Sequence, residues 1–163
     1  MARILILGLG NPLMGDDGIG AAIVEDLQRR HPVEGLRAEV APDILHLTSL
    51  WDGELDVWLV DAVSGGGPPG AIHIMGHERI FGLEDVHRSA HQLSLPEGLR
   101  WLIHGYPELS KARFRLWGIE PGQIVAASGL TPVVAAAAEA LSQAIAREAD
   151  RRLRRRAAAP GSC

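Results

Sequence analysis

The apolar residues of the chain form two kinds of segment, strand-like and helix-like, which alternate along the sequence. Runs of mostly apolar, strand-forming residues are typical of buried β-strands. We expect strands at residues 3–7, 36–41, 56–62, 71–75 and 112–118. The remaining segments carry helical spacing or helix-start signals, and the expected helices lie at 19–30, 44–51, 92–103 and from about Thr131 to about Arg155. Strands that alternate with helices predict an α/β fold, a three-layer α/β/α sandwich with a mainly parallel, twisted sheet of about five strands.

Length and cysteine content narrow the class of protein. A chain of 163 residues has room for one domain, and no linker or repeat divides it, so we expect residues 1–150 to form a single α/β domain. The only cysteine is Cys163, which excludes an internal disulfide or a metal site built on this chain's own thiolates. A chain without disulfides is typical of proteins in the reducing cytoplasm, so we expect that location. No apolar run approaches the roughly 18 residues needed to span a bilayer, so we expect no membrane insertion.

Charge is distributed unevenly along the chain. The net charge of −4 includes five Arg and no acid in residues 151–163, so residues 1–150 carry −9. An acidic body offers no broad surface for nucleic acid, and we expect none to bind. We expect the basic segment 151–163 to be a solvated, frayed C-terminal tail.

The loop after the first expected strand reads GLGNPLMGDDGIG at residues 8–20. Gly8 and Gly10 follow a strand and precede a helix, as in a dinucleotide-binding fingerprint. The third glycine of that fingerprint is missing, because Leu13 stands in its place, and Asp16 and Asp17 would repel a pyrophosphate. The alternative is that one carboxylate caps the helix while the other faces a cation.

Two further residues join this loop at one edge of the predicted sheet. Asp61 ends the apolar run VWLV, and His91 lies in a polar loop before an apolar segment. In a parallel sheet, ligands bind where the strands have their carboxyl ends. Asp17, Asp61 and His91 can meet there, and two carboxylates with one imidazole suit a divalent metal such as nickel or zinc. Spacing alone leaves His87 as a substitute for His91.

In five segments the chain resembles the nickel–iron hydrogenase maturation endopeptidases. These segments stand in the family's order and cover the chain to about residue 148: ILGLGNPLMGDDGIG near the start, LVDAV at 59–63, SAHQLSL at 89–95, WGIEP at 117–121 and GLTP before the last helix. The resemblance implies that Asp17, Asp61 and His91 bind metal, and it favours Asp17 over Asp16 and His91 over His87. The chain departs from many members at APDILHL, 41–47, where Asp43 replaces a Glu of the most similar branch.

The resemblance also implies a reaction. Family members remove a C-terminal extension from the hydrogenase large-subunit precursor once nickel has been inserted, and they are classified as aspartic-type peptidases. Nickel would arrive with the precursor, zinc or cadmium could occupy the site in vitro, and the free protein is expected to be a cytoplasmic monomer. Hydrolysis could use metal-activated water, or Asp16 or Asp17 as general base. A non-catalytic nucleotide- or small-ligand-binding module and a metal-dependent hydrolase of small substrates are the other hypotheses.

Overall fold

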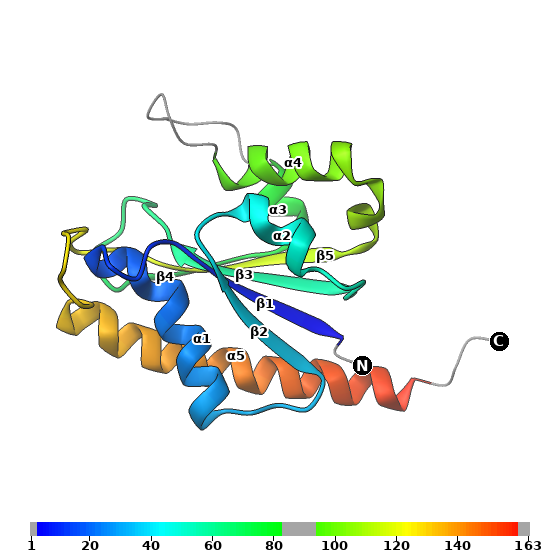
Figure 1. Ribbon diagram of the computed structural model, residues 1–163. Helices are drawn as coiled ribbons and strands as arrows, with labels where there is room; N and C mark the ends of the chain where they lie inside the picture. The colour runs from blue at the N-terminus through cyan, green and yellow to red at the C-terminus, as the bar shows by residue number, and fades with distance from the viewer. Residues whose placement is uncertain (1–2, 83–93, 160–163) are drawn as a thin grey trace.

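The computed structural model describes residues 3–82 and 94–159. At the centre of the fold is a five-stranded sheet in the order β2-β1-β3-β5-β4 (Figure 1). The strands are β1 (Ile4–Leu9), β2 (Leu36–Ala41), β3 (Asp56–Ala62), β4 (Ile72–Met75) and β5 (Arg113–Ile119). All neighbouring strands pair in parallel except β4, which runs antiparallel to β5. This confirms the predicted α/β fold with a mainly parallel sheet.

Helices cover both faces of the sheet. Below it in Figure 1 lie α1 (Ile19–Arg30) and α5 (Pro132–Ala158). Above it lie α2 (Leu47–Leu50), α3 (His77–Gly82) and α4 (Leu95–Gly105). The described residues also form three short 3-10 helices: η1 (Gly15–Gly18), η2 (Ile44–His46) and η3 (Pro107–Lys111). Among the helices of the described ranges, none is both long and apolar enough to cross a membrane.

Two hydrophobic cores follow from this layering. Successive strand side chains point to opposite faces, so Ile4 and Ile6 of β1 pack against α1 and α5, whereas Leu5 and Leu7 pack on the α4 side. The strand is buried on both faces, which is why its sequence is a continuous apolar run. Burial on both faces leaves the ends of the central strands as the places where polar side chains can act.

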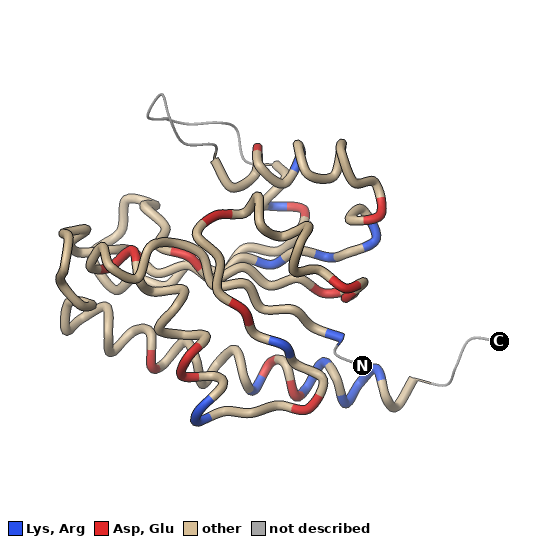
Figure 2. Tube along the Cα trace, viewed as in Figure 1, with Lys and Arg blue, Asp and Glu red and all other residues tan. Residues whose placement is uncertain are grey.

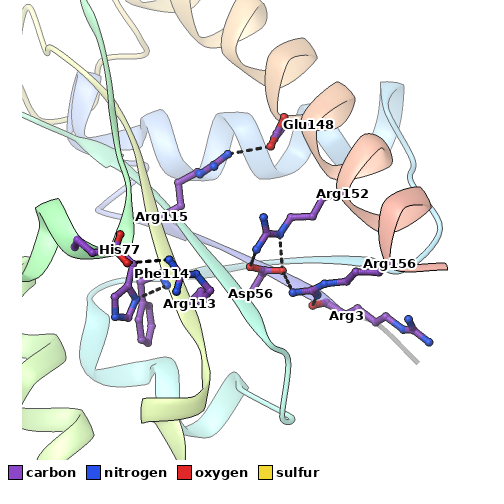
Figure 3. A network of polar contacts seen from close by, with 10 residues as sticks. Arg3, Asp56, His77, Arg113, Phe114, Arg115, Glu148, Arg152 and Arg156 are labelled. Atoms are coloured by element: carbon purple, nitrogen blue, oxygen red, sulfur yellow. Dashed lines mark hydrogen bonds and ion pairs between the residues drawn. The ribbon is translucent and has the colours of Figure 1, made fainter. Parts of the chain in front are cut away.

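The Arg-rich end of the chain differs from the expected frayed tail. Residues 151–158 continue α5, and the guanidinium groups of Arg152 and Arg156 both reach the buried carboxylate of Asp56 at the start of β3 (Figure 3). Arg152 donates through Nε and Nη2 at 2.8 Å, and Arg156 Nη2 lies 2.5 Å from Asp56 Oδ2. The last turns of the helix are therefore fixed to the sheet.

Asp56→Ala is expected to lower the free energy of unfolding by about 3 kcal/mol, because it leaves two partly buried guanidinium groups without their carboxylate. Asp150→Asn is the matched control, since Asp150 pairs with Arg154 at the surface of the same helix. An exposed pair of this kind contributes about 0.5 kcal/mol or less. Urea unfolding measures both variants, and equal small losses would show that Asp56 does not anchor α5.

Candidate functional site

The carboxyl ends of β1, β3 and β5 lie at one edge of the sheet, which we call the carboxyl edge. Acidic residues stand at each of these three ends: Asp16 and Asp17 after β1, Asp61 near the end of β3, and Glu120 directly after β5. Figure 2 shows acidic residues at this edge, and the described segments that form it contain no Lys or Arg. The electrostatic potential there favours a cation.

Asp17 is held at the carboxyl edge by a sharp turn. Gly10 adopts φ +105°, and a Cβ on this glycine would lie 2.3 Å from the carbonyl oxygen of Asp17, so the turn requires glycine. The backbone N–H of Asn11 donates to Asp17 Oδ2 at 2.8 Å. Asp17 is partly exposed, and within the described ranges its Oδ1 accepts no hydrogen bond, which leaves this oxygen available to a ligand.

Asp61 occupies the second-last position of β3 and is partly buried. The backbone N–H of Ala62 donates to Asp61 Oδ1 at 2.8 Å. Burial raises the pKa of Asp61 to about 7, the hydrogen bond from Ala62 opposes the rise, and the nearby negative charge of Asp17 adds to it. No Lys or Arg of the described chain offsets this charge. The two carboxylates therefore lie close together. A cation bound between them would offset both the cost of burying the Asp61 charge and its repulsion by Asp17.

Asp16 has a structural role, which argues against its use as a general base. Its carboxylate is fully buried and accepts hydrogen bonds from the backbone N–H groups of Gly122, Gln123 and Thr131, at 2.7–2.8 Å, and from the Thr131 hydroxyl. Burial alone would raise the pKa of Asp16, but these hydrogen bonds outweigh it and hold the pKa below its ordinary value. Asp16 does not cap α1, as one carboxylate of the pair was expected to do, because the N-cap of α1 is Gly18, with no side-chain hydrogen bond. Asp16 bonds instead to Thr131, the N-cap residue of α5.

Sequence reasoning missed the role of Glu120. Its buried carboxylate accepts hydrogen bonds from the backbone N–H groups of Gly65 and Gly66 and lies 2.7 Å from His73 Nε2. The hydrogen bonds from Gly65 and His73 lower the pKa of Glu120. This residue therefore fixes the loop that leaves Asp61, and its side-chain partner is His73 of β4. The available signal was a carboxylate directly after a buried strand, the same signal that identified Asp61.

Of the remaining metal-ligand candidates, Asp43 lies within the described residues. His91 and its alternative His87 fall outside the described residues. Asp43 follows β2 and caps η2, where its carboxylate accepts from the Leu45 N–H at 2.9 Å and lies 3.1 Å from His46 Nδ1. Within the described chain, no three His, Cys, Asp or Glu residues are grouped so that they could hold a metal ion. The structure thus brings together Asp17 and Asp61 of the predicted trio.

The shifted pKa of Asp61 predicts a pH dependence of stability in the metal-free protein. Its folded-state pKa, about 7, lies above the ordinary 3.8, so the stability it contributes is fully present below about pH 4 and is lost as pH rises through 7. Asp61→Asn removes this loss, and the variant should gain stability relative to the unsubstituted protein between pH 4.5 and pH 8. Urea unfolding at both pH values measures the difference. An unchanged difference would contradict the raised pKa.

The chain is similar to known proteins over most of its length. Residues 23–148 match the family model described as hydrogenase maturation protease. The chain is 32% identical over 156 residues to the hydrogenase 2 maturation protease of Escherichia coli, covering 88% of this chain and 89% of that protein. It is 35% identical over 107 residues to protein FrxA of Pyrococcus furiosus, covering 65% and 75% of the two chains.

Solved structures show the same likeness. The nickel–iron hydrogenase maturation protease HybD from Thermococcus kodakarensis superposes with a TM-score of 0.75 at 30% identity, covering 90% of this chain and 99% of that one. The hydrogenase maturating endopeptidase HybD from E. coli gives a TM-score of 0.66 at 28% identity, with 93% and 89% of the chains covered.

Proposed function

Because this chain belongs to the hydrogenase maturation proteases, we propose that it removes the C-terminal extension from the nickel-loaded precursor of a nickel–iron hydrogenase large subunit. The observation that carries the proposal is the pair Asp17 and Asp61. Both carboxylates lie at the carboxyl edge, close enough for one charge to raise the pKa of the other. A divalent cation delivered by the substrate would stabilise the pair, and a hydrogenase precursor carries one.

Nickel is the feature of the substrate that the site would recognise. Asp17, Asp61 and His91 would supply two oxygens and one nitrogen, a donor set that suits a borderline divalent ion. The described part of the chain contains no cysteine, so the thiolates that bind nickel most tightly would come from the precursor. The free protein should then bind nickel weakly and the nickel-loaded precursor well. Zinc and cadmium, with similar ligand preferences, should compete.

Recognition of the metal would also position the peptide for cleavage. Once Asp17 and Asp61 bind the nickel, the polypeptide that holds the ion lies at a fixed distance from the carboxyl edge, which replaces a bimolecular encounter by a preorganised one. Water then adds to the scissile carbonyl carbon, the C–N bond breaks, and a proton passes to the leaving amine. The water is activated by the metal or loses its proton to Asp17 as general base. The second route would make the enzyme carboxylate-dependent, in keeping with an aspartic-type peptidase.

The test is cleavage of the purified precursor, loaded or not loaded with nickel, followed by mass spectrometry. We expect the loaded precursor to lose a C-terminal fragment and the unloaded precursor to stay intact. Equal cleavage of both forms would contradict nickel recognition. No cleavage of the loaded form would overturn the proposed activity.

Asp17→Asn separates the two hydrolytic routes. If Asp17 is only a ligand, nickel-dependent binding and cleavage fall together. If it is also the base, cleavage falls further than binding.

A further inference from the structure

Two loops at the carboxyl edge form one hydrogen-bonded unit. The first runs through residues 10–18 and the second through 121–131, and Figure 1 shows them side by side at the end of the sheet. The backbone N–H of Asp16 donates to the Gln123 carbonyl at 2.8 Å, and that of Ala127 donates to the Leu13 carbonyl at 2.9 Å. The buried Asp16 carboxylate adds the bonds described above, so the two loops are held in one fixed arrangement.

This unit exposes large apolar side chains next to η1, the short helix that contains Asp17. Leu13 is 72% exposed, Ile124 52% and Val125 51%. We call these three residues the edge patch. The bond from Ala127 to Leu13 brings the two loops together there, and a Cβ on Gly15 would lie 3.0 Å from the Val125 nitrogen. Exposed apolar side chains gathered on a rigid surface are typical of binding sites for other proteins.

The charge around the edge patch narrows the class of partner. Residues 8–15 and 121–131 contain no charged side chain, in a chain of which 22% is charged. The Asp16 carboxylate is fully buried and accepts its hydrogen bonds from within the chain. A partner that covers the patch would therefore meet apolar side chains, backbone groups and uncharged polar neighbours such as Gln123 and Ser128. That surface fits an uncharged, apolar stretch of polypeptide.

We propose that the edge patch binds an apolar, uncharged segment of the large-subunit precursor next to its nickel site. This inference rests on the proposed function: a precursor whose nickel reaches Asp17 would bring its polypeptide close to η1, and Leu13 lies four residues before Asp17 in the loop that leads into η1. The patch would thus contribute affinity for the peptide and fix its position along the site, while the carboxylates bind the nickel. Its three residues would determine which precursor segment binds, and they take no part in peptide-bond hydrolysis.

The test compares a Leu13→Ser, Val125→Ser double variant with Leu55→Ser as matched control. Leu55 is 54% exposed and precedes β3, at the opposite end of the sheet from Asp61. We expect the double variant to bind nickel-loaded precursor about tenfold more weakly and to show a KM raised by the same factor, because it loses the burial of two apolar side chains. Its kcat and its melting temperature should stay unchanged, and the control should match the unsubstituted protein.

The outcomes separate the two proposals. Equal precursor affinity for the double variant and the unsubstituted protein would overturn the edge patch, and cleavage of the precursor would still support the proposed function. Weaker binding by the double variant without any cleavage by the unsubstituted protein would overturn the activity and keep the patch. Self-association that the double variant abolishes, seen by light scattering, would assign the patch to a second copy of this chain and overturn the proposal.

Discussion

Asp61→Asn is expected to slow cleavage of the nickel-loaded precursor at least about 100-fold. A neutral amide is a much poorer nickel ligand than a carboxylate, and changes even to outer-sphere residues of a metal site commonly cost 10- to 100-fold. The fold should survive, because the substitution removes a charge that burial and Asp17 already disfavour. The loss would therefore report on substrate recognition and not on unfolding. Steady-state cleavage rates at pH 7 to 8 measure it.

Asp52→Asn is the control for this variant. Asp52 is exposed and lies before β3, so the same chemical change is made away from the carboxyl edge. We expect its cleavage rate to match that of the unsubstituted protein. Full activity in Asp61→Asn would remove the carboxylate pair from the reaction and with it the observation on which the proposed function rests.

Asp16→Asn should affect stability where Asp17→Asn affects activity. The amide can accept fewer of the hydrogen bonds that Gly122, Gln123 and Thr131 donate, and its own N–H groups would face those donors. We expect a loss of about 3 kcal/mol in the free energy of unfolding. Within the described part of the chain, Asp17 accepts one hydrogen bond, from Asn11, and its substitution should cost less than about 1 kcal/mol. Urea unfolding of the two variants compares them directly.

The dependence of stability on acidic pH tests the structural role of Asp16 a second time. The folded-state pKa of Asp16 is lowered, so its contribution to stability is present above the ordinary pKa and is lost as pH falls through the lower folded value. Between pH 5 and pH 3 the free energy of unfolding of the unsubstituted protein should fall. That of Asp16→Asn should fall less, because the variant lacks the Asp16 carboxylate at every pH. Parallel stability curves for the two proteins over this range would contradict the structural role of Asp16.

The sequence was most informative where structure depends on local pattern. The apolar runs at 3–7, 56–62 and 112–118 are strands because both faces of these central strands are buried. The antiparallel direction of β4 could not be predicted, since a short edge strand carries no signal of its pairing. The ordered end of α5 was also missed, because Arg152 is bound by Asp56, which lies 96 positions earlier.

The site shows the same division. Asp17 and Asp61 could be found from sequence because strand ends in a parallel sheet converge, whatever the loops do. The separate role of Asp16 could not, since its donors Gly122 and Thr131 lie 106 and 115 positions away. Glu120 binds Gly65 across 55 positions, so its role as the support for the loop after Asp61 depends on the folded chain.

The most direct test of the central claim is the affinity of this protein for the precursor with and without nickel, measured for the unsubstituted protein and for an Asp17→Asn, Asp61→Asn double variant. If the two carboxylates recognise substrate-borne nickel, loading should tighten binding at least about tenfold for the unsubstituted protein and have no effect for the variant. Equal affinity of the unsubstituted protein for both precursors, or a nickel effect of the same size in the double variant, would contradict the account.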